Sequence, residues 1–159
     1  MLMAPLKIGF FSFTGCEGCV ITFLEILNTH YPEIAGRIDI KYARILKSKN
    51  ELTDLDVAFV EGAISSGREI TRIRDIRLAS KRVVAIGSCA VNGSPSNARN
   101  LFDEPKKAKV SALVEKLHQL PTVSPIKDYV KVDAEVQGCA MVESQFLEVL
   151  NKYLVEFNA

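Results

Sequence analysis

Short apolar segments alternate with segments of helical periodicity along this chain, and several of the apolar segments stop at a glycine. The first covers residues 6–13, and shorter ones cover 57–60 and 83–86. Continuous apolar runs of this length are typical of buried strands. Strands that alternate with helices pair in parallel, with helices on both faces of the sheet. We therefore predict an α/β fold with a doubly wound parallel sheet.

The other expected elements follow the same order. Alternating apolar and polar residues predict strands over 38–45 and 129–136, the first of them at an edge. Apolar residues at helical spacing predict helices over 20–32, 65–80, 107–120 and 143–157, and Pro121 and Pro125 break the third. At 159 residues and 48% hydrophobic, the chain fits one domain of ordinary size. We expect residues 1–159 to form a single domain of flavodoxin-like topology.

Charge and targeting signals exclude several classes of function. Twenty basic against nineteen acidic residues leave a net charge of +1, so binding of nucleic acid through bulk charge is not expected. The N-terminal residues lack a basic region, a cleavage site and a twin-arginine pair, which predicts an unexported, cytoplasmic protein. The apolar runs are far shorter than the roughly 20 residues of a membrane-spanning helix, so no transmembrane segment is predicted.

The four cysteines carry the strongest functional signal. Cys16, Cys19, Cys89 and Cys139 each follow the end of a predicted strand, and each has a glycine within two residues. Because the carboxyl ends of parallel strands meet at one edge of the sheet, we expect the four to converge there. Glycine-rich turns let backbone amides approach the sulfides of an iron–sulfur cluster, which is the interpretation we favour.

Four other interpretations stay open. In the first three, the cysteines serve as buried structural residues, as disulfide partners or as zinc ligands. In the fourth, Cys16 and Cys19 form a thioredoxin-like redox pair. Zinc sites usually have two close pairs, or cysteines with histidine, whereas His30 and His118 fall in predicted helices away from this edge. No glycine-rich phosphate loop follows any strand.

Four motifs in order resemble those of the small subunit of nickel-iron hydrogenases and of the related cluster-bearing subunit of respiratory complex I. The motifs are Cys-Glu-Gly-Cys at 16–19, Val-Glu-Gly-Ala-Ile at 60–64, Gly-Ser-Cys-Ala at 87–90 and Gly-Cys at 138–139. The resemblance covers nearly the whole chain. Complex I relatives have adjacent cysteines in the first motif, whereas Glu17 and Gly18 separate them here, which favours the hydrogenases.

The resemblance implies one 4Fe-4S cluster held by Cys16, Cys19, Cys89 and Cys139. The cluster would lie nearest to a nickel-iron site on a separate large subunit, with which this chain would form a heterodimer, and further subunits would carry the electrons onward. Residues expected around the ligands are Glu17, Gly18, Glu61, Gly62, Gly87 and Gly138. No catalytic residue is expected on this chain itself, which is most similar to the short, single-cluster small subunits of cytosolic hydrogenases.

One motif departs from the family. The usual Pro-Gly-Cys-Pro is replaced by Gln137-Gly-Cys-Ala140, so two rigid residues are missing beside Cys139. A looser loop or a retuned cluster is the expected consequence. The alternative functions are a cluster subunit of a complex I-like, quinone-linked assembly and a structural metal-binding assembly module.

Overall fold

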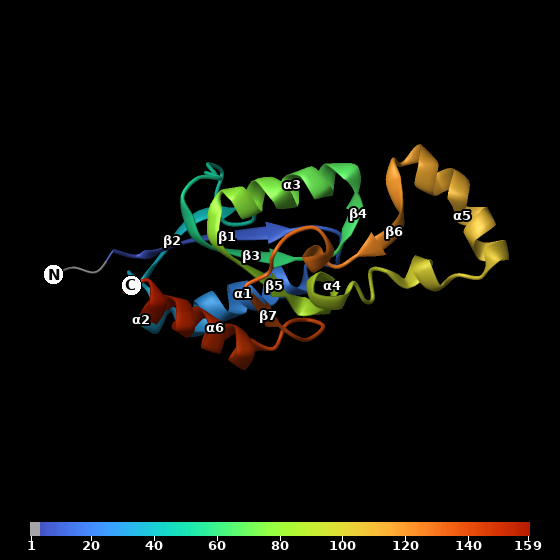
Figure 1. Ribbon diagram of the computed structural model, residues 1–159. Coiled ribbons are helices and arrows are strands. Elements are labelled where there is room, and N and C mark those ends of the chain that lie inside the picture. Colours follow the sequence, from blue (N-terminus) through green and yellow to red (C-terminus); the bar gives the residue numbers. More distant parts are fainter. Residues whose placement is uncertain (1–3) are drawn as a thin grey trace.

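A five-stranded parallel sheet with helices on both faces forms the centre of the computed structural model, which describes residues 4–159 (Figure 1). The elements in chain order are β1 (Leu6–Ser12), α1 (Gly18–Thr29), α2 (Tyr31–Ile34), β2 (Ile38–Ala43), β3 (Leu55–Glu61), β4 (Ile64–Ser66), α3 (Gly67–Leu78), β5 (Ser80–Ile86), α4 (Gly87–Asn92), the 3-10 helix η1 (Ala98–Leu101), α5 (Glu104–Lys116), β6 (Gln119–Ser124), the 3-10 helix η2 (Ile126–Asp128), β7 (Ala134–Val136) and α6 (Glu143–Glu156). The strand order is β2-β1-β3-β5-β7. This order is that of flavodoxin-like sheets, so the predicted fold class is confirmed.

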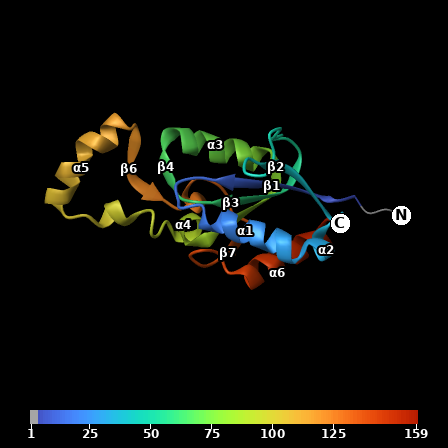
Figure 2. The ribbon, with the colours of Figure 1, turned by 180° about the vertical axis from the view of Figure 1, so that it is seen from behind.

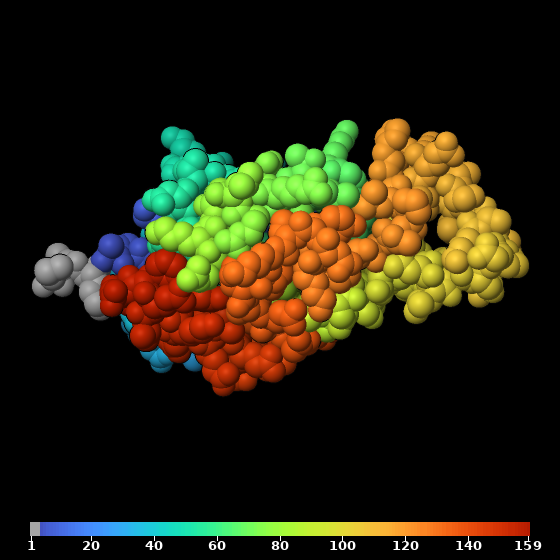
Figure 3. Space-filling model, in the orientation of Figure 1, coloured from blue at the N-terminus to red at the C-terminus, as the bar shows by residue number. Residues whose placement is uncertain are grey.

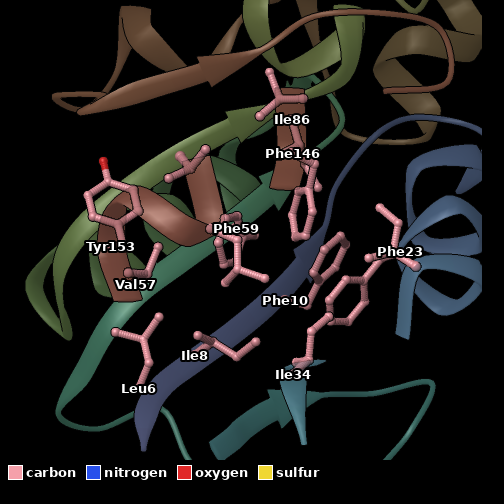
Figure 4. Packing of buried hydrophobic residues seen from close by; sticks show 14 of the residues in the cluster. Leu6, Ile8, Phe10, Phe23, Ile34, Val57, Phe59, Ile86, Phe146 and Tyr153 are labelled. Carbon is pink, nitrogen blue, oxygen red and sulfur yellow. The ribbon is translucent and has the colours of Figure 1, made fainter. Parts of the chain in front are cut away.

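Helices cover the sheet on both sides, as the two opposite views show (Figures 1 and 2). Helices α1 and α6 pack on one face, and α3 packs on the other. Aromatic rings fill the first interface: the Phe10 and Phe23 rings stack at 4.3 Å, and those of Phe59 and Phe146 lie 4.9 Å apart (Figure 4). Burial of these large side chains stabilises the fold by about 1.5–3 kcal/mol each.

The register of the sheet aligns the ends of four strands. Ser12 pairs with Glu61, Glu61 with Ile86, and Ile86 with Val136. Because all four strands run in the same direction, the loops that leave these residues lie side by side at the carboxyl edge. That edge is where ligands of open α/β sheets bind.

The segment between α4 and β7 differs from the sequence-based prediction. A helix over 107–120 is expected, but α5 spans Glu104–Lys116, because Asp103 caps it by accepting a hydrogen bond from the Lys106 N–H at 3.0 Å. Its apolar face does not cover the sheet: Leu113 and Leu117 are 53% and 56% exposed. The helix projects from the main body beyond the carboxyl edge of the five-stranded sheet (Figure 3).

Two short strands were not expected. Pro121 lies inside β6, which pairs antiparallel with β4 in a separate two-stranded sheet, so this proline does not simply end a helix. The predicted strand over 129–136 is mostly wrong, because only Ala134–Val136 pairs with β5.

Within residues 4–159, no helix is long and apolar enough to cross a membrane.

Candidate metal centre

The four cysteines lie in three segments that follow strands at the carboxyl edge of the sheet. Cys16 and Cys19 follow β1, Cys89 follows β5, and Cys139 follows β7. All four line one small pocket, together with Glu61 at the end of β3. None of them forms a disulfide bond. The predicted convergence is therefore present, and the disulfide interpretation is wrong for this structure.

Cys89 lies in a helix rather than in the expected loop. The short helix α4 begins directly after β5, and its residues Ala90 and Val91 are buried in the core next to α3. The Ser88 N–H donates a hydrogen bond to the Gly138 carbonyl at 2.8 Å. This bond ties the Cys89 segment to the Cys139 loop.

Gly87 allows the closest approach in the pocket. Its φ of +77° lies in the left-handed region, and a Cβ at this position would be 2.4 Å from the Sγ of Cys19. Such a distance is far inside van der Waals contact, so only glycine fits between β5 and this thiol. The lack of a side chain at Gly87 therefore makes room for the Cys19 sulfur in the pocket.

The Cys139 loop is held by hydrogen bonds where the resembled family has prolines. The Gln137 N–H donates to the side-chain oxygen of Gln145 on α6 at 3.0 Å, a bond that proline cannot form. The Val142 N–H donates to the Gln137 carbonyl at 2.8 Å and closes the turn. The Cys139–Ala140 peptide bond is cis. The loop is thus anchored at both ends, in contrast to the expected loosening.

Glu61 is a buried carboxyl group beside Cys19. It is 3% exposed, and it accepts hydrogen bonds from the Ser12 hydroxyl at 2.7 Å and from the Val20 N–H at 3.2 Å. Burial raises its pKa above the usual value, although these hydrogen bonds oppose the shift. Glu61 thereby connects the ends of β1 and β3 to the first turn of α1.

Burial also raises the pKa of Cys19, to about 11, and the neighbouring Glu61 adds to this effect. A backbone hydrogen bond from Met141 opposes the shift, because it stabilises the thiolate. A metal would have to displace the thiol proton, since only thiolates serve as metal ligands. The Met141 amide is then a donor to the bound sulfur.

Ser96 is a pocket neighbour that the sequence did not reveal. Its hydroxyl lies 3.2 Å from the Sγ of Cys89 and 3.1 Å from the Thr14 carbonyl. It therefore joins the segment after α4 to the loop that precedes Cys16. The composition of residues 92–97 predicts a loop, but it does not show which residue of the loop places its hydroxyl group against a cysteine.

The other predicted neighbours of the cysteines lie as expected. Glu17, Gly18, Gly62 and Gly138 line the pocket. Glu17 is exposed, adopts a left-handed conformation with φ 61°, and occupies the N-cap position of α1.

The two histidines do not line the cysteine pocket. Both lie just beyond helix ends rather than inside helices: His30 separates α1 from α2, and His118 follows α5. Among residues 4–159, no three histidine, cysteine or acidic side chains are gathered tightly enough to hold one metal ion.

Comparison with known proteins identifies the family. The model of "NADH ubiquinone oxidoreductase, 20 Kd subunit" matches residues 16–153 of the chain. The chain belongs to this family. The family also contains the small subunits of nickel-iron hydrogenases, so the resemblance seen in the motifs is confirmed.

Curated relatives of this 20 kDa-family member are hydrogenase subunits. It is 31% identical to a subunit of the F420-non-reducing hydrogenase of Methanocaldococcus jannaschii, over 95% of this chain and 58% of that protein. It is 29% identical to the delta subunit of sulfhydrogenase 2 of Pyrococcus furiosus, over 91% of this chain and 60% of that protein. The chain thus spans about 60% of the length of these relatives.

Solved structures show the same fold. A chain of an NAD+-reducing [NiFe]-hydrogenase in the H2-reduced state superposes with a TM-score of 0.82 and 24% identity. The match covers 96% of this chain and 92% of that one. At this identity the likeness establishes the architecture only.

Proposed function

We propose that this family member is the electron-transfer small subunit of a nickel-iron hydrogenase. Cys16, Cys19, Cys89 and Cys139 ligate one 4Fe-4S cluster, which is proximal to a nickel-iron site in a separate large subunit. The observation that carries this proposal is the convergence of four free thiols, from the segments that follow β1, β5 and β7, on one pocket. Four cysteine thiolates are the usual ligand set of a 4Fe-4S cluster.

The groups around the thiols fit such a cluster. Gly87 removes the side chain that would collide with Cys19, while the Met141 amide and the Ser96 hydroxyl are directed at two different sulfurs. Hydrogen bonds to ligand sulfurs stabilise the added negative charge of a reduced cluster. When bound, the cluster supplies one-electron transfer, and this chain supplies ligation, insulation and tuning of the potential.

The proposal places catalysis on the partner. The large subunit holds the nickel-iron site and forms a heterodimer core with this chain, and further electron-transfer subunits connect the cluster to the final acceptor. The relatives, which are subunits of an F420-non-reducing hydrogenase, a sulfhydrogenase and an NAD-reducing hydrogenase, support this assignment. The four unpaired thiols suit the reducing cytoplasm, where we place the complex.

A complex I-like, quinone-linked assembly is the second candidate. The name of the matching family, which is that of a ubiquinone oxidoreductase subunit, favours it. The Cys-x-x-Cys spacing of the first motif favours the hydrogenase. Hydrogen-dependent reduction of the cluster in the purified complex separates the two candidates.

The deciding experiment is metal analysis of the complex purified anaerobically with its large subunit. We expect about four irons and four sulfides per chain, no stoichiometric zinc, and an EPR signal that appears when hydrogen is added. Zinc without iron would instead identify a structural module. Iron that only quinol reduces, and hydrogen does not, would support the quinone-linked assembly.

Single cysteine variants test the ligand set. Cys16→Ser, Cys19→Ser, Cys89→Ser and Cys139→Ser should each lower the iron content and abolish hydrogen-dependent reduction of external acceptors. Ala112→Ser, on the exposed side of α5, is the matched control because it adds a hydroxyl group without removing a thiol. A cysteine whose replacement leaves both measurements at the level of this control is not a ligand.

A further inference from the structure

Thr14 lies two residues before Cys16 and joins the loop after β1 to several other segments. Its N–H donates to the Ala63 carbonyl at 3.1 Å, and its own carbonyl accepts the Ala63 N–H at 2.8 Å. The two bonds form an antiparallel bridge to the turn between β3 and β4. The backbone of Thr14 is therefore fixed directly before the loop that carries Cys16.

The Thr14 hydroxyl makes a second set of contacts, with β4 and α3. It lies 2.6 Å from the Ser65 hydroxyl oxygen and donates to the Glu69 carboxylate at 2.9 Å. The Ser65 hydroxyl lies 3.1 Å from the other oxygen of the same carboxylate. Two hydroxyl protons thus serve three contacts, and whichever hydroxyl donates to the other, the carboxylate still accepts one proton.

Glu69 holds these hydroxyls from a helix end. It lies in the first turn of α3, where it forms a capping box with Ser66. Its carboxylate also accepts hydrogen bonds from the Ser65 N–H at 2.7 Å and from the Ser66 N–H at 3.0 Å. Hydrogen bonds to a charged group are stronger than those between neutral groups. We call Thr14, Ser65 and Glu69 the Thr14 lock.

The Thr14 carbonyl extends this lock to the cysteine pocket. It accepts the Ser96 hydroxyl at 3.1 Å, and the oxygen of that hydroxyl lies 3.2 Å from the Sγ of Cys89. A single hydroxyl proton therefore has two acceptors, the carbonyl and the sulfur. The Thr14 carbonyl holds the Ser96 oxygen within hydrogen-bonding reach of Cys89.

We propose that Thr14 is a positioning residue for the metal centre. The Thr14 lock keeps the Ser96 hydroxyl beside the Cys89 sulfur and thereby tunes the reduction potential of the cluster. A donor near a ligand sulfur stabilises the reduced state, and the effect depends on the distance between donor and sulfur. The inference rests on the proposed function, because the potential is that of the proposed cluster.

EPR-monitored redox titration of the complex purified with its large subunit tests the proposal. Thr14→Val keeps the shape of the side chain and removes only its hydroxyl. The reduction potential should become more negative, as in Ser96→Ala, because the loosened carbonyl lets the Ser96 hydroxyl move away from the sulfur. Thr14→Ser keeps the hydroxyl and should restore the wild-type potential. Thr71→Val is the matched control, because Thr71 is exposed on α3 and its hydroxyl donates to a carbonyl of its own helix.

A double variant shows whether Thr14 acts through Ser96. If it does, Thr14→Val combined with Ser96→Ala should have the potential of Ser96→Ala alone, because the group that Thr14 positions is already missing. A general loosening of the Cys16 loop would instead shift the potential by the sum of the two single changes.

Denaturant unfolding of the full chain measures the lock independently of the cluster. Thr14→Val and Glu69→Gln alter the two sides of one hydrogen bond, so their effects should not add. We expect a coupling of about tenfold in the unfolding equilibrium constant. Glu25→Gln, at an exposed position on α1, is the matched control and should be additive with Thr14→Val.

Three outcomes at full iron content would overturn the inference and leave the proposed function intact. They are a potential in Thr14→Val that is unchanged or more positive, additive potentials in the double variant with Ser96→Ala, and additive unfolding effects of Thr14→Val and Glu69→Gln. Absence of iron from the wild-type complex would refute the proposed function itself. The inference would then fail with it, because the lock would have no cluster to tune.

Discussion

Gly87 and Cys19 lie so close together that a methyl group on the glycine would be 2.4 Å from the sulfur. The left-handed φ of +77° at Gly87 adds a second requirement for glycine. Gly87→Ala should therefore lower the iron content of the complex and reduce the free energy of unfolding by more than the roughly 1–2 kcal/mol that the left-handed conformation costs an alanine. Iron analysis and denaturant unfolding measure the two effects.

Gly36 offers a matched control for this change. Its φ of +79° is nearly the same, but no atom lies within 4 Å of the position that a Cβ would take. Gly36→Ala should cost only the conformational term and leave the iron content unchanged. If both variants lose stability equally and both retain iron, the contact between Gly87 and Cys19 has no role in the site.

The sheet and the convergence of the cysteines could be predicted because both depend on local patterns. The buried strands are continuous apolar runs, and the parallel order then places their carboxyl ends together, with Ser12, Glu61, Ile86 and Val136 in register. No detail of the side chains is needed for this step. The positions of Cys16, Cys19, Cys89 and Cys139 follow from it.

The positions of α5 and β6 could not be predicted in the same way. The apolar residues of α5 have helical spacing, but this pattern does not reveal that Leu113 and Leu117 stay exposed. The strand β6 contains Pro121 and pairs outside the main sheet, which sequence rules disfavour. The contact between the Ser96 hydroxyl and the Thr14 carbonyl joins segments distant in the chain, which periodicity does not encode.

His30 makes the stability of the fold depend on pH. Its ring nitrogens lie 3.2 Å from the carboxylates of Glu33 and Glu143, and these hydrogen bonds raise its pKa above 6.5. A raised pKa in the folded state means that the stabilisation is fully present below pH 6.5 and is lost as the pH rises through the folded-state pKa. His30→Gln should therefore reduce the free energy of unfolding more at pH 5.5 than at pH 8.5.

His118 serves as the control for this pH effect. It follows α5 and forms no ion pair within residues 4–159. Denaturant unfolding of His118→Gln should give the same difference between the two pH values as the wild type. If His30→Gln also shows the same difference in free energy of unfolding between the two pH values as the wild type, the contacts with Glu33 and Glu143 do not contribute to stability.

Phe146 fixes α6 against the sheet. Its side chain is fully buried, and its ring lies 4.9 Å from that of Phe59 and 5.8 Å from that of Phe23 (Figure 4). Phe146→Ala should lower the free energy of unfolding by about 3–5 kcal/mol, because it removes a large ring and leaves a cavity. Leu78→Ala, at a position that is 87% exposed, should change it by less than about 0.5 kcal/mol. Similar losses in both variants would contradict this packing.

Ser96 connects Cys89, a proposed ligand, to the loop before Cys16 through its hydroxyl, which lies 3.2 Å from the Cys89 sulfur. Ser96→Ala should make the reduction potential of the cluster more negative, because a donor that stabilises the reduced state is lost. EPR-monitored redox titration of the purified complex measures the potential. Ser96→Thr keeps the hydroxyl and should restore it, while Ser94→Ala, at an exposed position nearby, should have no effect. An unchanged potential in Ser96→Ala at full iron content would show that this hydroxyl donates to the Thr14 carbonyl alone.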